Sequence, residues 1–238
     1  MRRMTSVMVM MSGLALAGAS GAAAQTIADD PVAYAELNIA GQTQSTTIAT
    51  SSTFSLFGEP GATSSSSTVG KGLVFDGGAG YFVRKNLAIG LTVTVFTRSP
   101  SGTASVTIPD PLAFNSFTTL SASPRLTQTE LGGHLKVAYF MRVLDKVDLV
   151  VAAGPSFIHL ERDLASATVV NGTPKITVDT ERGNAWGAHG SLDLNYLFTP
   201  QLGGGIFVRY IAAQADLQSA SGIKVGGFQG GLGVRLRF

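Results

Sequence analysis

Residues 221–238 read SGIKVGGFQGGLGVRLRF and decide how the rest of this chain is interpreted. Counting back in twos from the last residue gives a set that is apolar or glycine: Phe228, Gly230, Leu232, Val234, Leu236 and Phe238. The intervening set is small, polar or cationic: Gln229, Gly231, Gly233, Arg235 and Arg237. Since successive side chains of an extended strand point to opposite faces, one face of this segment is apolar and the other is not. A strand of a soluble sandwich can show the same alternation.

The first 24 residues have the three parts of a secretory signal peptide. Arg2 and Arg3 form the charged start, residues 7–19 are apolar, and the small residues 22–24 form a cleavage site after Ala24. A membrane-anchor helix is the alternative, but the apolar core is short and rich in Ala and Gly. No later segment approaches the roughly 18 apolar residues of a spanning helix. If the mature chain, residues 25–238, lies in a membrane, it crosses as strands.

The composition excludes several classes of function. The chain has 17 Lys and Arg against 15 Asp and Glu, and the two balance once Arg2 and Arg3 are removed, so nothing points to a nucleic-acid partner. It has no cysteine, which excludes disulfides, thiolate metal sites, a cysteine nucleophile and a lipoprotein anchor. The 29 glycines suit tightly curved strands.

Seven further segments alternate as the last one does. They are residues 33–42, 73–81, 87–96, 130–142, 147–158, 186–198 and 206–211. Short polar turns at residues 84–86, 145–146 and 199–201 join three hairpins, although Val150 and Ile158 disturb the alternation. Aromatic residues fall beside these turns or at the terminus, as a girdle at a membrane–water boundary requires: Tyr81, Tyr139, Tyr196, Phe198 and Phe238.

Long connections join the strands at the other end. Residues 43–69 are dominated by Ser, Thr and Ala and predict a long mobile loop, and residues 99–126 are broken by four prolines. Within residues 162–180, Asn171-Gly172 is a strong hairpin signal, so the flanking strands should continue past the membrane, although Pro174 weakens the pairing. The sequence therefore predicts an all-β fold, an eight-stranded antiparallel transmembrane up-and-down β-barrel, with long loops outside and short turns and chain ends on the periplasmic side.

The signal peptide, residues 196–200 (YLFTP), residues 208–210 (VRY) and the terminal Phe238 resemble the small OmpA/OmpX-type outer-membrane barrels. The resemblance is to the outer membrane protein beta-barrel domain family of proteobacteria and covers nearly all of the mature chain. It implies a Gram-negative outer-membrane location after Sec-type export, a monomer, and Phe238 as a C-terminal assembly signal. The implied partners are outer-membrane lipid, lipopolysaccharide and the barrel-assembly machinery. It implies little about activity, because one fold hosts many functions.

The lumen of an eight-stranded barrel is just wide enough to be filled by side chains. The alternation places a polar network inside: Glu36, Asp76, Glu130, Lys136, His189, Asp193, Arg209, Arg235 and Arg237. We expect Asp193 to pair with Arg209 across the third hairpin, and Glu36 to meet Arg235 and Arg237 where the barrel closes. These groups would plug the lumen at two heights. The alternative is a water-lined channel.

The sequence gives little indication of catalysis or metal binding. His189 and Ser191 are similar to the His-x-Ser motif of lipid A deacylases, but the Ser-Asn pair of that pattern is missing and the alternation turns both side chains inward. His134 and His159 have no companions at ligand spacing, so we expect no metal and no cofactor. The leading hypothesis is a non-enzymatic barrel with a structural or surface-interaction role. The alternative is a narrow channel for small or hydrophobic solutes, as in OmpW-type barrels, and the third hypothesis is a lipid-modifying enzyme.

Overall fold

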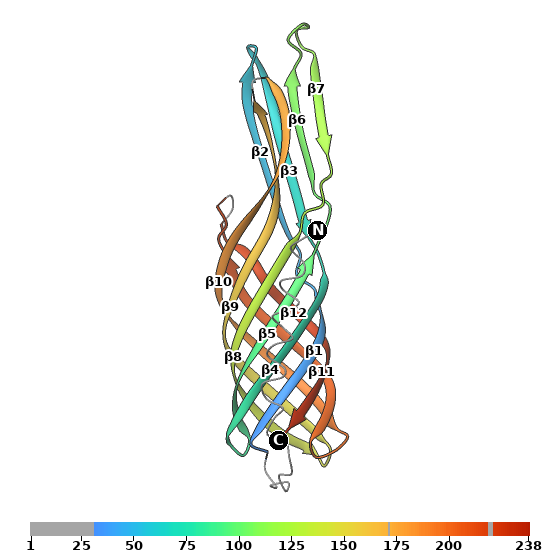
Figure 1. Ribbon diagram of the computed structural model, residues 1–238, viewed down its shortest axis with the longest axis vertical. Helices are drawn as coiled ribbons and strands as arrows, with labels where there is room; N and C mark the ends of the chain where they lie inside the picture. Colours follow the sequence, from blue (N-terminus) through green and yellow to red (C-terminus); the bar gives the residue numbers. More distant parts are fainter. Residues whose placement is uncertain (1–30, 171, 219–220) are drawn as a thin grey trace, which may run out of the picture.

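Eight strands close into an antiparallel β-barrel (Figure 1). The computed structural model describes residues 31–170, 172–218 and 221–238. The predicted signal peptide, residues 1–24, lies outside these residues. The barrel strands are β1 (Ala33–Gln42), β4 (Gly72–Arg84), β5 (Leu87–Arg98), β8 (Gln128–Leu144), β9 (Val147–Val170), β10 (Thr173–Leu197), β11 (Leu202–Ala215) and β12 (Ile223–Arg237). Each pairs with the next one in this order, and β12 returns to β1, so the predicted eight-stranded up-and-down barrel is confirmed.

The first and last strands close the ring. Glu36 lies opposite Arg235 in the β1–β12 register. The backbone of Phe238 continues this pairing, because its N–H donates to Ala33 O at 2.9 Å and its carbonyl accepts from Val32 N at 2.5 Å. The chain therefore ends at the same end of the barrel as the short turns (Figure 1).

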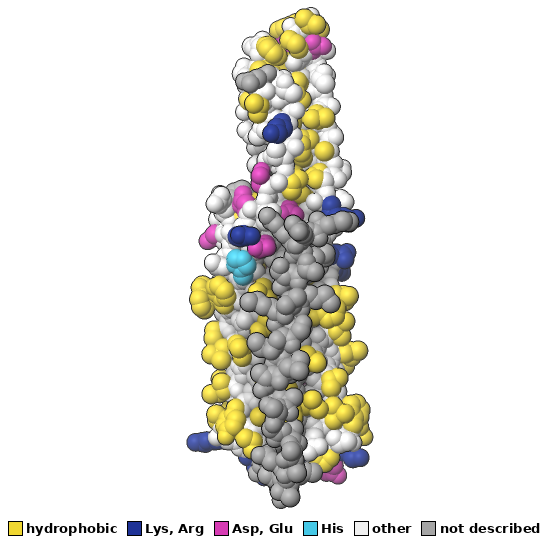
Figure 2. Space-filling view, in the orientation of Figure 1, with side chains coloured by type: hydrophobic (Ala, Val, Ile, Leu, Met, Phe, Trp, Pro, Cys, Tyr) yellow, Lys and Arg dark blue, Asp and Glu magenta, His cyan; other side chains and the backbone are white. Residues whose placement is uncertain are grey.

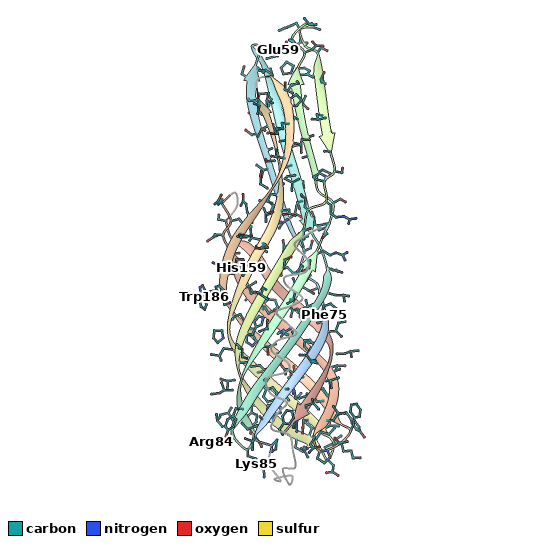
Figure 3. The ribbon with its side chains drawn as sticks, viewed as in Figure 1. Glu59, Phe75, Arg84, Lys85, His159 and Trp186 are labelled. Atoms are coloured by element: carbon teal, nitrogen blue, oxygen red, sulfur yellow. The ribbon has the colours of Figure 1, made fainter. Side chains whose placement is uncertain are left out.

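The barrel is apolar outside and polar inside, as the alternation predicts. In β12 the Leu236 side chain is 43% exposed, whereas Arg235 beside it is 5% exposed. Figure 2 shows hydrophobic side chains covering the barrel wall, with charged side chains gathered at its two ends. Phe75 and Trp186 project outward from the wall, and Arg84 and Lys85 lie at a short turn (Figure 3). A soluble protein buries its apolar side chains, so this inverted distribution suits a wall surrounded by lipid.

The prediction of long loops at residues 43–69 and 99–126 is wrong. These segments form β2 (Thr46–Leu56), β3 (Glu59–Val69), β6 (Thr103–Pro109) and β7 (Phe117–Ala122), which pair in the order β2-β3-β6-β7 as a second sheet. The described residues thus contain twelve strands rather than eight. The Ser- and Thr-rich stretch does pack, because Val106 and Ala104 of β6 are buried and Ala104 clusters with Ala165 of β9.

Strands β9 and β10 supply the support for this second sheet. They have 24 and 25 residues, far more than the roughly 9–11 that cross a bilayer. Val170 pairs with Thr173, which confirms the predicted hairpin, although Asn171 lies outside the described residues. We name β2, β3, β6, β7, residues 163–170 of β9 and residues 173–180 of β10 the tower, since together they extend from one end of the barrel (Figure 1).

Pro174 does not weaken the β9–β10 pairing, and the reason is its position in the ladder. It lies opposite Val169, which is seven residues beyond Arg162 along β9. Asp163 N donates to Thr127 O at 2.8 Å, on the side of β9 away from β10. Hydrogen-bonding direction alternates along a strand, so Val169, six residues later, also turns its amide away from β10. Pro174 opposite it faces outward in the same way, and the ladder loses no hydrogen bond.

Candidate functional site

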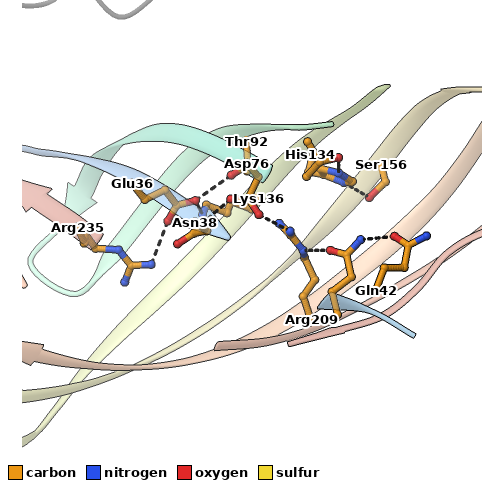
Figure 4. Close-up of polar contacts among 12 residues, drawn as sticks. Glu36, Asn38, Gln42, Asp76, Thr92, His134, Lys136, Ser156, Arg209 and Arg235 are labelled. Carbon is orange, nitrogen blue, oxygen red and sulfur yellow. Dashed lines mark hydrogen bonds and ion pairs between the residues drawn. The ribbon is translucent and has the colours of Figure 1, made fainter. Parts of the chain in front are cut away.

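In the part of the lumen nearer the short turns, the polar contacts centre on one carboxylate, that of Glu36 in β1. It forms an ion pair with Lys136 of β8, accepts from Arg235 Nη2 of β12 at 2.9 Å, and accepts from the Thr92 hydroxyl at 2.9 Å (Figure 4). Arg235 Nη2 also lies 2.8 Å from an Asp193 carboxylate oxygen. Four charged groups from four strands therefore meet across the lumen, two acids against two cations. All four are buried.

An aromatic layer lies next to this charge cluster. The rings of Tyr34, Phe82 and Phe140 pack with centroids 4.8–5.8 Å apart, and the Arg235 guanidinium lies 5.4 Å from the Phe140 centroid. Gly80 makes room for Tyr34, since a Cβ there would collide with the tyrosine ring. Arg237 forms an ion pair with the buried Asp148, so a second charged level accompanies the aromatic rings.

A further charged level involves Asp76 and Arg209. The Asp76 carboxylate accepts from Arg209 Nη2 at 2.5 Å and from Asn38 Nδ2 at 2.5 Å (Figure 4). Arg209 Nε donates to Gln229 at 2.9 Å, and Gln229 donates to Gln42 at 2.8 Å. The chain of contacts thus links β4, β11, β12 and β1, four neighbouring strands of the ring.

Two histidines share one serine within the barrel. Ser156 Oγ is hydrogen-bonded to His134 Nδ1 at 2.8 Å and to His189 Nδ1 at 3.0 Å. Thr94 Oγ1 lies 3.0 Å from His134 Nε2. The Ser156 side chain is 1% exposed, which leaves no approach for a substrate. His189 therefore contacts Ser156 on the neighbouring strand, and no hydrogen bond joins it to Ser191 in the described network.

All nine residues predicted for the interior are buried, but the predicted ion pair of Asp193 with Arg209 is wrong. Asp193 lies opposite Phe207, and Arg209 lies opposite Ser191. The hairpin is centred on residue 200 rather than 201, and moving the centre by one residue shifts each partner by two. Arg209 consequently pairs with Asp76, and Asp193 with Arg235.

At the closing seam the prediction is confirmed for one arginine only. Arg235 reaches Glu36, as expected. Arg237 instead pairs with Asp148 of β9, a residue that the sequence analysis did not place inside. Val150 is buried, and alternation gives Asp148, two residues earlier, the same inward direction. The sequence pattern therefore did contain the information that places Asp148 inside the barrel.

Arg162 was also missed, because it lies at the start of a predicted loop. Arg162 is fully buried and lies on β9 past the part of the strand that carries exposed apolar side chains on the barrel wall. Its Nη2 donates to Ser67 O of β3 at 3.0 Å. Burial lowers its pKa, and the nearby Glu130 carboxylate acts in the opposite direction. Arg162 thus ties the tower to the barrel. Glu130 itself accepts from Gln128 at 2.7 Å.

Among the described residues, no group of three or more His, Cys, Asp or Glu side chains is arranged to hold a metal ion. Within the same residues, no helix has the length and apolarity needed to cross a membrane.

The architecture defines a class of protein. An even number of antiparallel strands, short turns at one end, long excursions at the other, an apolar wall and a polar interior are the features of an outer-membrane-type transmembrane barrel. With eight strands and a lumen filled by side chains, this chain has the fold of the small OmpA/OmpX-type barrels.

Comparison with known proteins gives fold neighbours only. No family model matches the sequence, and no curated protein sequence matches it either. Outer membrane protein OprG from Pseudomonas aeruginosa is 12% identical, with a TM-score of 0.48 over 88% of this chain and 96% of that one. Neisserial surface protein A is 15% identical (TM-score 0.44, 87% and 97%) and outer membrane protease OmpT from Escherichia coli is 10% identical (TM-score 0.43, 90% and 99%). At these sequence identities and TM-scores, the comparisons assign no activity to this chain.

Proposed function

We propose that this protein is a non-enzymatic barrel of the Gram-negative outer membrane that holds the tower outside the cell for contact with other molecules. The observation that carries the proposal is the charged network across the lumen, centred on Glu36 and Arg235. A barrel filled in this way anchors the tower without conducting solutes.

The network supports a closed lumen on energetic grounds. Breaking a buried ion pair by removing one partner costs about 3–5 kcal/mol, because the other charge stays buried and uncompensated. Glu36 and Arg235 each have two ionic partners, so opening a path between them disrupts several contacts at once. The aromatic layer of Tyr34, Phe82 and Phe140 adds an apolar barrier.

Conductance measurement tests this proposal. The full-length mature protein, refolded and inserted in a planar lipid bilayer, should give no stable unit steps. A Glu36→Ala, Arg235→Ala double variant, if folded, should give steps, because it removes the central contacts. Stable steps from the unmodified protein would instead favour the narrow channel for small or hydrophobic solutes, which the many charged groups in the lumen also suit.

The absence of enzyme activity is part of the proposal. Ser156 has a histidine partner on each side, but both histidines and the serine are buried, so no lipid can reach the hydroxyl. We expect Ser156→Ala and Ser191→Ala to leave the lipid A profile of the producing cells unchanged. A changed profile in either variant would reinstate the lipid-modifying enzyme.

The partners proposed for the barrel follow from its surface. The apolar wall suits outer-membrane lipid and lipopolysaccharide, and Phe238, exposed beside the start of β1, suits recognition by the barrel-assembly machinery as a C-terminal signal. No cofactor is proposed. We propose a monomer, because the eight-strand ring closes on itself.

A further inference from the structure

A groove of about 870 Å³ runs along the tower, between the β2–β3 hairpin and β9. Its walls include alternate residues of β2, namely Ile48, Thr50, Ser52 and Phe54, which present one face of that strand. From β9, however, every residue from Leu164 to Val169 lines the groove. Thr63 to Ser67 of β3 also line the groove without a break, although β3 is paired with β2 and β6 there, so the lining shows that β9 borders the groove along six residues and does not by itself show a free edge.

Beyond the barrel, one edge of β9 is paired with no strand among the described residues, although β3 and β6 pack against β9. In the barrel β9 lies between β8 and β10, but pairing with β8 reaches only to Arg162, opposite Gln128. Among the described residues, the hydrogen bond from Asp163 N to Thr127 O is the last backbone hydrogen bond on that side. Above it, β9 pairs with β10 alone in the described sheet.

The direction of the free backbone groups can be worked out from the register. Asp163 turns its N–H away from β10. Because hydrogen-bonding direction alternates along an antiparallel strand, Ala165, Ala167 and Val169 turn their N–H and C=O groups the same way, into the groove. An unpaired row of this kind is a template for another strand. Ala165 is buried against Ala104 and Leu126, so the open part of this edge is at Ala167 and Val169, whose side chains are small or β-branched.

The remaining walls restrict what could lie there. Ten of the lining residues carry hydroxyl groups: Thr50, Ser52, Ser55, Thr63, Ser64, Ser65, Ser66, Ser67, Ser166 and Thr168. Ile48, Phe54 and Leu164 add apolar surface. The charged lining residues are Asp179 and Glu181, and none of the described lining residues is Lys or Arg. An anionic ligand is therefore disfavoured, and Asp179, opposite Leu164, places negative charge near the barrel end of the groove.

We propose that this groove binds an extended peptide segment of another protein, which pairs with Ala167 and Val169 as an added β-strand. Ser166 to Val169 offers about 13 Å of edge at about 3.3 Å per residue, enough for four residues of the bound segment. Backbone hydrogen bonds provide affinity in this mode, and pockets for alternate side chains provide selectivity. The segment has alternating small or β-branched residues, and a basic residue near Asp179. The inference rests on the proposed surface-interaction role and names its partner class.

Peptide selection tests the proposal on the full-length mature protein in lipid nanodiscs. Random twelve-residue peptides displayed on phage are selected against it, with Ala167→Pro as the counter-selected variant. Proline is tolerated at an edge position whose N–H is unpaired, but it removes the Ala167 donor and adds a ring to the edge. Thr53→Pro, on β2, is the matched control for a proline placed elsewhere in the tower. The heat-induced shift on unboiled gels confirms that each variant is folded.

The expected result is enrichment of peptides with alternating β-branched residues. A synthetic copy of the best one should lose at least tenfold in affinity for Ala167→Pro and when alternate amides of the peptide are N-methylated. No enrichment, or binding that survives both changes, overturns the proposal. Concentration-dependent dimerisation that Ala167→Pro abolishes also overturns it, because a second copy would then fill the groove. None of these outcomes alters bilayer conductance, so the closed-lumen proposal fails or stands separately.

Discussion

At the scale of single residues, Asp193 shows how a small error in register changes the chemistry of the lumen. Alternation alone places Asp193, Arg209 and Arg235 inside the barrel, but only the three-dimensional register pairs Asp193 with Arg235. The inward direction survives a shift of two residues, since two is the period of the strand. The same shift does change which residue lies opposite Asp193.

Double-mutant cycles should reproduce this pairing. Asp193→Ala leaves Arg235 with one acid, and we expect a loss of up to about 3–5 kcal/mol in the free energy of unfolding, less if water enters. The loss should shrink in an Arg235→Ala background and persist in an Arg209→Ala background. Unfolding in urea with the protein in lipid vesicles measures all of these. Coupling to Arg209 instead of Arg235 would contradict the observed register.

Gly80 provides a second prediction at this scale. Gly80→Ala places a methyl group against the Tyr34 ring, and overpacking of this kind costs about 1–3 kcal/mol. Gly41→Ala is the matched control, because the nearest atom to a Cβ there is Gly230 O at 4.0 Å. The free energies of unfolding of the two variants should differ by at least about 1 kcal/mol. Equal values would mean that Tyr34 can move aside without loss.

At the scale of elements, the same residue type has different surroundings in the barrel wall and in the tower. Leu194 of β10 is 44% exposed and Leu120 of β7 is 41% exposed. The first lies on the barrel wall and faces lipid, whereas the second lies in the tower and faces water. The exposed fraction of the side chain therefore does not distinguish the two positions, but substitution by a charged residue does.

Leu194→Arg should lower the free energy of unfolding by about 2–4 kcal/mol near the bilayer midplane and by less near an interface. Leu120→Arg should change it by no more than about 0.5 kcal/mol, as surface substitutions usually do. Both are measured in lipid vesicles. If the two variants lose the same amount, the barrel wall is not surrounded by lipid where we place it.

At the scale of the whole molecule, the tower and the short turns lie at opposite ends of the barrel (Figure 1). The connection between β6 and β7 is exposed from Pro111 to Asn115 and includes Leu112 and Phe114, while Glu59 lies near the far end of the tower (Figure 3). A protease outside the cell would meet this connection first. Exposed loop tips are the preferred sites of cleavage.

Protease added to intact cells should therefore cut within residues 111–115 and spare the turns at 85–86 and 145–146. Permeabilising the outer membrane should add cleavage at those turns, which provides the internal control. Mass spectrometry of the fragments locates each cut. Cleavage at the short turns of intact cells, with an intact tower, would reverse the orientation of the barrel.

The sequence by itself determined the barrel, because side-chain alternation is a local property. Eight alternating segments, the short turns and the inward direction of Glu36, Asp76 and Arg235 can all be read without knowing which strand lies beside which. The hairpin of β9 and β10 could be read in the same way from Asn171-Gly172. Tertiary structure alone decided the ion pairs, since a partner such as Lys136 for Glu36 is 100 residues away. It also decided the tower: Ser- and Thr-rich segments form strands only because β9 and β10 extend beyond the barrel and give β3 and β6 a surface to pack against.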